Sequence, residues 1–262
     1  MDRVLQIVGG GRMGEALLGG LIAGGRAAGS LAVVEVAAAR REQLGRDYPG
    51  VTVAEAAVEA PDALLAVKPG DVPAAAAAVA DAGAERALSV AAGVTTRAIE
   101  EASGGRLRVI RAMPNTPALI GAGASAISAG ADAGHDDMAW AEEVLGAVGV
   151  VVRVPESQLD AVTGLSGSGP AYVFLVAEAL AEAGVLNGLP RDTAETLAFE
   201  TLAGAARLLA QGDTSPADLR AAVTSPGGTT AAGLAELERH GARAAFLDAV
   251  TAATRRSREL GA

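Results

Sequence analysis

The chain has no cysteine among its 262 residues. This absence excludes disulfide bonds, thiolate metal sites and a cysteine nucleophile, and it fits a reducing compartment. Histidine is scarce as well, because His135 and His240 are the only two and lie far apart in polar stretches. Neither a histidine metal site nor a Ser-His-Asp triad is therefore expected, and we predict no bound metal.

Positive charge and long apolar runs are also in short supply. The chain carries 21 Lys+Arg against 31 Asp+Glu, for a net charge of −10. No basic stripe with interleaved aromatic residues is present, so we expect no nucleic-acid partner. No apolar run looks long and uninterrupted enough to span a bilayer, and the first residues lead into a strand-like run without a signal-peptide pattern. The expected location is cytoplasmic, with no membrane partner.

Residues 1–154 alternate short apolar runs with helical stretches, which predicts a doubly wound α/β domain with a parallel sheet covered on both faces. The expected strands are Val4–Val8, Leu31–Glu35, Ala63–Val67, Ala87–Val90, Leu107–Ala112 and Val148–Val154. Helices are expected up to Ala23, around Arg40–Arg46 and over Ala74–Ala82, the last with Asp71 near its cap and Pro73 in its first turn.

Residues 155–262 lose the strand pattern and predict an all-α domain. The expected helices are Pro170–Ala183, Pro190–Ala210, Thr229–His240 and Ala242–Leu260. Ser168 or Gly169 would cap the first of these helices and Gly184 would end it. Its only charges are Glu178 and Glu182, so most of its circumference should be buried. We expect a second copy of the chain to cover these helices in a homodimer; packing against the first domain is the alternative.

A glycine fingerprint follows the first expected strand and opens a helix. Its residues are Gly9, Gly11 and Gly14, with Arg12 and Met13 between the last two. In this strand–turn–helix context the glycines let the backbone approach a dinucleotide pyrophosphate, as in a Rossmann domain. All five residues are therefore candidate cofactor contacts. The alternative is a glycine-rich turn without a ligand.

Glu35 ends the second expected strand, where an acidic residue binds the ribose 2′-hydroxyl and repels a 2′-phosphate. This position favours NADH over NADPH. Arg40 and Arg41 follow closely, and they would suit NADPH instead. A solvated strand end without a ligand is the third interpretation.

Two further segments leave expected strand ends, at the edge of the sheet where ligands bind. The first contains Val67, Lys68 and Pro69, and Lys68 is the one lysine of the chain. It is a cofactor contact or a surface charge. The second has two prolines around Asn115, which stiffen the loop and suit it to hold Met113 and Asn115 beside a nicotinamide. A structural turn is the alternative there.

Two small-residue segments lie in the helical region. Ser166–Pro170 either lets two backbones pack closely or lines a pocket with hydroxyls. In Thr224–Thr230, Pro-Gly-Gly stops one helix and two threonines start the next. That break leaves free N–H groups ringed by hydroxyls, which suits a small anion; a helix–helix turn with a cap is the alternative.

The chain resembles the pyrroline-5-carboxylate reductase family. The matching segments are Gly9–Gly14, Ala66–Pro69, Arg111–Ala118, Leu165–Tyr172 and Ser225–Thr230, in the family's order over essentially the whole chain. The resemblance implies reduction of 1-pyrroline-5-carboxylate to L-proline, the last step of proline biosynthesis, by NADPH or NADH. It also implies a Rossmann domain followed by a helical domain that intertwines with a partner subunit, with rings of dimers in some relatives.

The resemblance further implies roles for individual residues. Ser225 and the backbone of Gly227, Gly228 and Thr229 would hold the substrate carboxylate, and the catalytic Thr230 hydroxyl would bind the ring nitrogen. Lys68, Met113 and Asn115 would lie along the cofactor. One departure is Glu35, because many relatives carry a hydroxyl or amide residue followed by Arg there, which suits NADPH.

Two rival functions remain at the level of sequence. A 3-hydroxyacid dehydrogenase has a similar layout but relies on a lysine at the start of the helical domain, whereas Lys68 lies in the first domain. A nucleotide sensor without catalysis would need the glycine fingerprint but not the Ser225–Thr230 segment. The sequence leaves open the oligomer size beyond a dimer, feedback by proline, activity on other cyclic imines and the proton donor.

Overall fold

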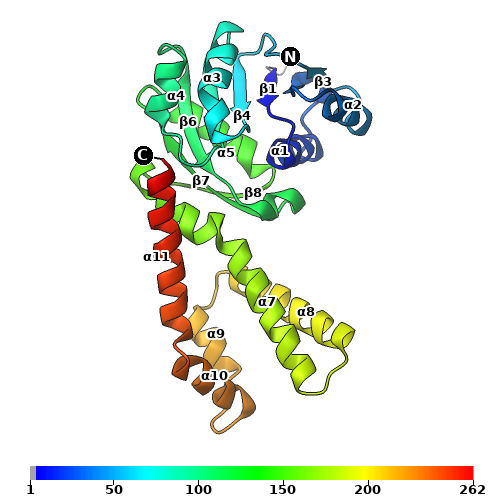
Figure 1. Cartoon of the computed structure of the whole chain (residues 1–262), viewed down its shortest axis with the longest axis vertical. Coiled ribbons are helices and arrows are strands. Elements are labelled where there is room, and N and C mark those ends of the chain that lie inside the picture. Colours follow the sequence, from blue (N-terminus) through cyan, green and yellow to red (C-terminus); the bar gives the residue numbers. More distant parts are fainter. Residues whose placement is uncertain (1–3, 262) are drawn as a thin grey trace. The chain divides into compact units, whose positions relative to one another are not determined.

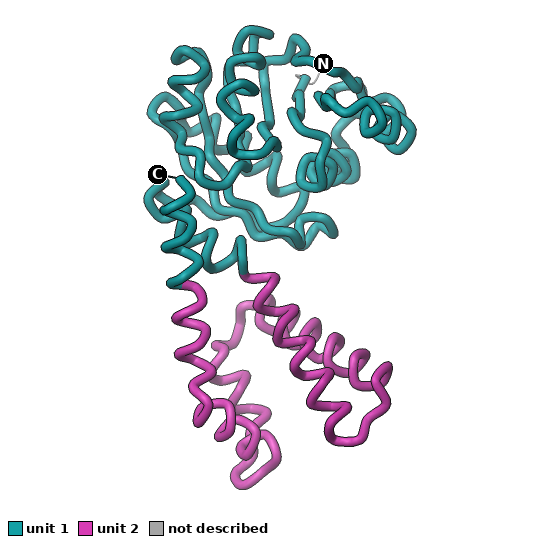
Figure 2. The backbone as a smooth tube through the Cα atoms, in the orientation of Figure 1, with its two compact units in different colours: residues 1–168, 251–262 teal, residues 169–250 magenta. Residues whose placement is uncertain are grey.

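A computed structural model of the chain describes residues 4–261 and gives the element order labelled in Figure 1. The chain forms two compact units, distinguished by colour in Figure 2. Unit 1 comprises Met1–Ser168 with Thr251–Ala262, and unit 2 comprises Gly169–Val250. The last strand ends at Arg153, close to the expected change from strands to helices, whereas the compact units divide farther along the chain.

Unit 1 contains one sheet, in which the described residues form eight strands. The strands are β1 (Leu5–Val8), β2 (Leu31–Val34), β3 (Thr52–Ala54), β4 (Asp62–Leu65), β5 (Arg86–Ser89), β6 (Arg108–Met113), β7 (Gly123–Ala129) and β8 (Gly149–Arg153). Their order across the sheet is β3-β2-β1-β4-β5-β6-β7-β8. The strand order therefore reverses between β1 and β4, which are themselves parallel, and ligands bind at such a switch point in doubly wound sheets.

The expectation of a wholly parallel sheet is wrong for one pair of strands. β6 and β7 are antiparallel, and Met113 lies opposite Ala126. Only a short 3₁₀ turn, Thr116–Ile120, joins these strands, and a parallel pair needs a much longer crossover. β7 is not among the expected strands because Gly, Ala and Ser dominate it, and these residues give little strand signal.

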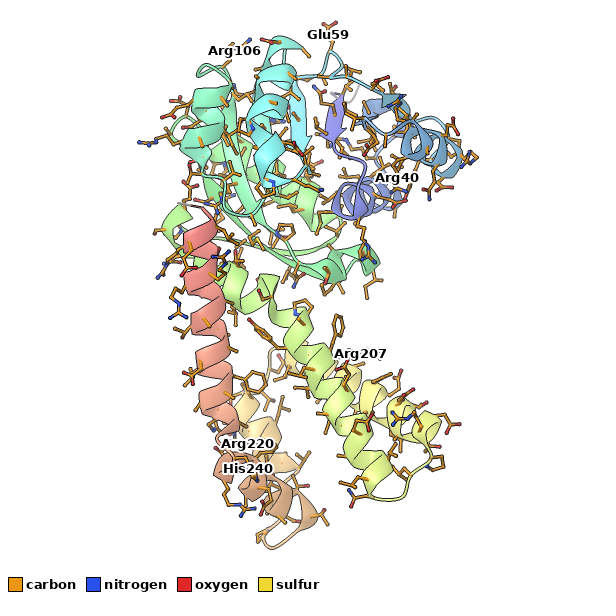
Figure 3. The ribbon with its side chains drawn as sticks, viewed as in Figure 1. Arg40, Glu59, Arg106, Arg207, Arg220 and His240 are labelled. Atoms are coloured by element: carbon orange, nitrogen blue, oxygen red, sulfur yellow. The ribbon has the colours of Figure 1, made fainter. Side chains whose placement is uncertain are left out.

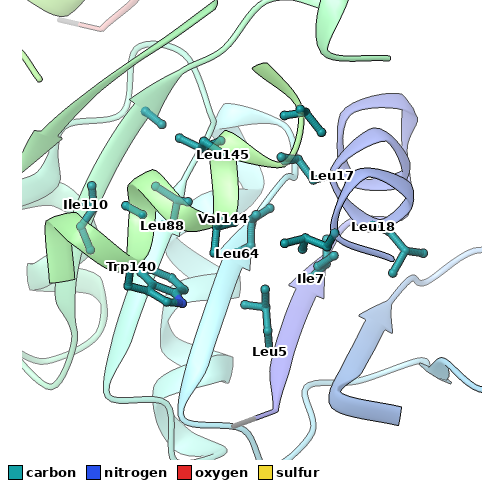
Figure 4. Packing of buried hydrophobic residues seen from close by; sticks show 14 of the residues in the cluster. Leu5, Ile7, Leu17, Leu18, Leu64, Leu88, Ile110, Trp140, Val144 and Leu145 are labelled. Carbon is teal, nitrogen blue, oxygen red and sulfur yellow. The ribbon is translucent and has the colours of Figure 1, made fainter. Parts of the chain in front are cut away.

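Helices cover the sheet on both faces, as predicted. α1 (Arg12–Ala23), α2 (Ala38–Asp47) and α5 (His135–Gly146) bury Leu17, Leu44 and Trp140 in one core cluster, part of which Figure 4 shows. α3 (Val72–Asp81) and α4 (Thr96–Ala102) bury Val79 and Ile99 in the other. The strands between them read as continuous apolar runs because both of their faces are buried.

The remaining helices are α6 (Leu159–Val162), α7 (Gly169–Leu186), α8 (Arg191–Ala210), α9 (Pro216–Ala222), α10 (Thr229–Arg239) and α11 (Ala242–Leu260). α8, α10 and α11 confirm the prediction to within a residue or two at each end. Gly184, however, does not end α7. A Cβ atom there would lie 2.9 Å from the Ala194 Cβ atom, so the missing side chain lets α7 and α8 pack closely.

α7 starts at Gly169, within a residue of the expected start at Pro170, but it is not the separate, capped helix that was expected. A single π-helical turn, Thr163–Gly167, joins α6 to α7, so Pro170 lies inside a helical stretch that runs from Glu156 to Leu186. By length and composition this stretch is apolar enough to cross a membrane, because its most apolar 18-residue window has a mean hydropathy of 1.4. The run is hidden in the sequence because Gly-Pro at 169–170 resembles a helix boundary. Pro170 is tolerated because the π turn already interrupts the regular ladder of helical hydrogen bonds.

Unit 2, whose residues are all described, has almost no core of its own. Its buried hydrophobic residues are Ala181, Ala194 and Ala198. Large apolar side chains instead face outward, including Phe174, which is 61% exposed, and Phe199, which is 49% exposed. Such a surface is far more apolar than an isolated helical unit tolerates in water, so it requires a covering surface.

Candidate active site

The glycine loop between β1 and α1 has the backbone that a dinucleotide site needs. Gly9 has φ +103°, and a Cβ atom there would lie 2.6 Å from the carbonyl oxygen of Ala66. At Gly14 a Cβ atom would lie 2.0 Å from the carbonyl oxygen of Gly9. Nothing lies within 4 Å of the corresponding position at Gly11, so this glycine leaves the loop open. Arg12 and Met13 then begin α1, whose first N–H groups have no acceptor within the helix.

The loop after β4 lies directly beside this glycine loop. The Ala66 N–H donates to the Val8 carbonyl over 2.8 Å, and Val67 Cγ1 would lie 3.1 Å from a Cβ atom on Gly9. The exposed Lys68 and then Pro69 follow, and Pro69 begins a short 3₁₀ turn. The fold thus brings two of the predicted cofactor segments together at the switch point of the sheet.

Glu35 is held at the end of β2 by hydrogen bonds to both carboxylate oxygens. Oε2 accepts from the Gly10 N–H over 3.0 Å, and Oε1 accepts from the Ala37 N–H over 2.9 Å. The remaining lone pairs of the carboxylate are available to hydroxyl donors. A carboxylate fixed beside the glycine loop can accept hydrogen bonds from a ribose diol, and its negative charge would repel a 2′-phosphate.

The two arginines that follow Glu35 are already engaged. Arg40 donates to the Gly10 carbonyl over 2.7 Å and pairs with Glu15 over 2.5 Å. Arg41 donates to the carbonyl oxygens of Glu35 and Val36 and pairs with Glu55 over 3.1 Å. Both guanidinium groups therefore support the loop and the strand end in this structure.

The loop after β6 contacts the π-helical turn. Asn115 Nδ2 donates to the Ser166 carbonyl over 3.2 Å, and Asn115 Oδ1 accepts from the Ala124 N–H over 2.9 Å. A Cβ atom on Gly167 would lie 2.5 Å from Met113 Cε. The small residues at 166 and 167 thus allow close packing, which was one of the two interpretations of this segment. The Asn115 side chain holds β7 and the turn in place.

A cavity of about 360 Å³ opens at the carboxyl ends of β4 and β5. Pro69 lines it after β4, and Ala92 and Gly93 line it after β5. The π turn contributes Thr163, and α11 contributes Arg256 among others. The cavity lies in unit 1, at the edge of the sheet where the cofactor segments end.

Glu156, Thr96 and Arg111 form a hydrogen-bonded junction that the sequence did not predict. Glu156 accepts hydrogen bonds from the Thr96 N–H over 2.8 Å, from the Thr96 hydroxyl over 2.7 Å and from Arg111 Nη1 over 3.2 Å. Burial raises the pKa of Glu156, but these hydrogen bonds outweigh burial and hold the pKa below its ordinary value. Sequence spacing gives no signal for this junction, since Glu156 lies 60 residues from Thr96.

The Ser225–Thr230 segment, in unit 2, forms the N-terminus of α10. Gly227 has φ +69°, and Gly228 is the N-cap residue, with no side chain bonded to the helix end. A Cβ atom on Gly228 would lie 2.3 Å from Ser225 Oγ, so the hydroxyl lies against a bare glycine backbone. Thr229 and Thr230 start the helix and are exposed in the single chain. An uncapped helix N-terminus beside hydroxyl groups suits a carboxylate.

Comparison with known proteins finds the same two-part organisation. Residues 156–260 match the family described as pyrroline-5-carboxylate reductase dimerisation, and residues 4–93 match the family described as NADP oxidoreductase coenzyme F420-dependent. The pyrroline-5-carboxylate reductase of Synechocystis sp. is 48% identical, over 100% of this chain and 99% of the relative.

Solved structures agree with these sequence matches. A pyrroline-5-carboxylate reductase from Coxiella burnetii has a TM-score of 0.94 at 37% identity, with 100% of both chains covered. The Plasmodium falciparum pyrroline carboxylate reductase with NADP bound has a TM-score of 0.86 at 26% identity, covering 100% of this chain and 99% of the other. The chain, with its nicotinamide-type glycine loop and its dimerisation region, belongs to the pyrroline-5-carboxylate reductase family.

Proposed function

We propose that this chain reduces 1-pyrroline-5-carboxylate to L-proline, with NADH as the preferred cofactor, in the cytoplasm. The observation that carries the proposal is the combination of two sites in one chain. One is the open glycine loop at the switch point of the sheet, and the other is the uncapped N-terminus of α10 with Ser225 against Gly228. A dinucleotide-binding protein without imine reduction has no need for the second site.

In the proposed reaction the cofactor supplies a hydride to the imine carbon, and the ring nitrogen ends as a protonated amine. Ser225 and the backbone N–H groups near Gly227, Gly228 and Thr229 hold the substrate carboxylate. The Thr230 hydroxyl hydrogen-bonds the ring nitrogen. A protonated imine is already a strong electrophile, so the enzyme contributes mainly by positioning carbon against the hydride donor.

On the cofactor side, Glu35 would hold the adenosine ribose, and Gly9, Gly11 and Gly14 with the first turn of α1 would hold the pyrophosphate. Val67, Lys68 and Pro69 extend this path beyond β4. Met113 and Asn115 would lie along the nicotinamide end of the cofactor, where Asn115 keeps the loop in place.

The NADH preference follows from three charged side chains. The Glu35 carboxylate is fixed by Gly10 and Ala37, so it cannot easily turn away from a 2′-phosphate. Arg40 and Arg41 would have to give up hydrogen bonds before either one could bind that phosphate. The NADP-bound Plasmodium relative is only 26% identical, and the preference of this chain rests on its own residues.

In this proposal two copies of the chain associate through the helical region to form a homodimer. A larger ring of dimers is the alternative. Support comes from unit 2, where Phe174, Phe199 and other large apolar side chains lack cover in the single chain. The match of residues 156–260 to a dimerisation family points to the same surface.

The deciding experiment follows oxidation of NADH and of NADPH with 1-pyrroline-5-carboxylate as the acceptor. We expect turnover with both cofactors and a higher kcat/KM with NADH. Glu35→Ser should shift the ratio of the two kcat/KM values toward NADPH by about tenfold or more, the effect of losing one charged hydrogen-bond acceptor. Glu42→Gln removes the same charge from an exposed position on α2 and should leave the ratio unchanged.

Each contrary result has a distinct meaning. NADH binding without turnover would support the nucleotide-sensor alternative. Turnover of a 3-hydroxy acid but not of the imine would support the dehydrogenase alternative. A clear wild-type preference for NADPH would disprove the role given to Glu35.

A further inference from the structure

Gly10, the central residue of the glycine loop, is held from both sides. Its N–H donates to Glu35 Oε2 over 3.0 Å, and its carbonyl accepts from Arg40 Nε over 2.7 Å. A Cβ atom at this position would lie 2.6 Å from Leu44 Cδ1, so the peptide also packs tightly against α2. These contacts fix the orientation of the peptide groups that lie between Gly9 and Gly11.

Each of the three guanidinium nitrogens of Arg40 donates a hydrogen bond in this arrangement. Besides Gly10, its guanidinium donates to Glu15 Oε2 over 2.5 Å and to Gln43 Oε1 over 2.8 Å. Glu15 lies in the first turn of α1, immediately after the loop. Arg40 therefore links α2 to the middle of the glycine loop and to the first turn of α1, and Figure 3 shows it in the region of α1 and α2.

Tyr48 lies beside Glu15, and burial together with the charges of Glu15 and Asp47 raises the pKa of Tyr48. The Tyr48 hydroxyl therefore adds no second charge beside Glu15. The hydrogen bonds run from Glu15 through Arg40 to the carbonyl of Gly10.

We propose that Arg40, anchored by Glu15, is a positioning residue that holds the glycine loop in the conformation that receives the cofactor pyrophosphate. This inference rests on the proposed use of a nicotinamide dinucleotide. It assigns Arg40 a different role from the recognition of a 2′-phosphate, which the sequence alone leaves open. Preorganisation of a loop improves affinity because the ordering cost is met before the ligand arrives.

The charges around the loop are consistent with this role. Glu15 and Glu35 place two carboxylates near a site for a dianionic pyrophosphate, which would oppose binding if neither were compensated. Arg40 lies between them and neutralises Glu15 directly. Loss of Arg40 therefore both frees the loop and exposes the second carboxylate.

The test measures the dissociation constants of ADP-ribose, NADH and NADPH for the full-length oligomer. Arg40→Gln should weaken all three by a similar factor of about tenfold, the scale of one charge-assisted hydrogen bond. Arg46→Gln removes the same charge from an exposed position of α2 and should change them by less than about twofold. Arg40→Lys, which keeps the charge but not the fork, should recover only part of the loss.

Kinetics separate loop positioning from a general loss of structure. The KM for NADH should rise in Arg40→Gln, whereas the KM for the imine stays near its wild-type value. Unchanged ADP-ribose affinity, weakening of NADPH alone, or an equal rise in both KM values would each overturn the proposal. ADP-ribose binding needs no turnover, so a failure of the proposed reaction would appear in the imine assay alone.

Discussion

Thr230 is the residue on which the proposed chemistry depends most directly. It lies in the first turn of α10, exposed in the single chain, next to a glycine backbone that no side chain caps. In the proposal its hydroxyl binds the ring nitrogen of the substrate, whereas the neighbouring N–H groups bind the substrate carboxylate. These separate roles make Thr230 distinguishable from its neighbours by mutation.

Thr230→Ala should lower kcat/KM for the imine. The transition state should lose about 1–3 kcal/mol of stabilisation, the scale of one buried hydrogen bond. Thr230→Ser should restore most of the activity, because it keeps the hydroxyl. Thr229→Ala keeps the backbone N–H and serves as the matched control. An unchanged kcat/KM in Thr230→Ala would disprove the assigned role.

Glu156 controls a pH-dependent part of the stability. Its folded-state pKa lies below the unfolded value, so the group stabilises the fold above its ordinary pKa. This contribution disappears as the pH falls through the folded-state pKa. Acid should therefore loosen the junction that Glu156 forms with Thr96 and Arg111.

Glu156→Gln should destabilise the protein by about 1–3 kcal/mol at neutral pH, because the amide places a donor against the donors of Thr96 and Arg111. The difference from wild type should shrink as the pH falls below the ordinary pKa of a glutamate and disappear once the pH has passed the lower folded-state pKa of Glu156. Urea unfolding at fixed protein concentration measures both values. Glu142→Gln, which breaks the exposed pair with Arg153, is the control and should show little effect. A difference that stays constant with pH would contradict this explanation.

At the scale of elements, sequence signals worked where neighbours along the chain determine the structure. The glycine loop, the buried strands and helices α8, α10 and α11 follow from local periodicity and from turn residues. The same reasoning failed at β7, because its Gly, Ala and Ser residues give little strand signal. It also failed at the π-helical turn, where Asn115 bonds to Ser166, a residue 51 positions away.

The α7–α8 pair gives a test of packing between elements. Gly184→Ala should lower the melting temperature, because its Cβ atom would lie 2.9 Å from the Ala194 Cβ atom and force the helices apart. Overpacking of this kind costs about 1–3 kcal/mol and exceeds the gain in helix propensity of about 1 kcal/mol. Gly146→Ala, at a helical position with nothing within 4 Å, should instead raise or preserve the melting temperature. If both variants melted alike, close packing at Gly184 would not be the reason for this glycine.

At the scale of the whole molecule, the two units differ in how many large apolar side chains they bury. Unit 1 buries large side chains on both faces of its sheet, whereas unit 2 buries three alanines. The long apolar stretch Glu156–Leu186 has only 6% of its most apolar window buried within the single chain. The dimerisation match covers this stretch, so a second copy explains its exposed surface.

Phe174 and Phe199 line a cavity of about 390 Å³ with Ala177 and Glu178. Because Phe174 lies within the dimerisation match and is exposed in the single chain, a charge there should weaken association. Phe174→Glu should shift the protein toward monomers in light scattering and lower the melting temperature. The wild-type melting temperature should itself rise with protein concentration, because association stabilises only the folded chain. Val150→Glu alters an exposed apolar residue of β8 outside the dimerisation match and serves as the control. A Phe174→Glu protein with wild-type mass and stability would show that another surface forms the interface.

The sequence by itself determined the α/β-then-helical order, the glycine loop, the acidic end of β2 and the Ser225–Thr230 helix start, because each depends on residues close together along the chain. Tertiary structure decided which side chains are free to act. It showed that Arg40 holds Gly10, that Asn115 holds the π turn, and that Glu156 joins α4 to β6. The physical reason is that a hydrogen-bond partner is selected by distance in space, which sequence spacing does not reveal once the partners lie on different elements.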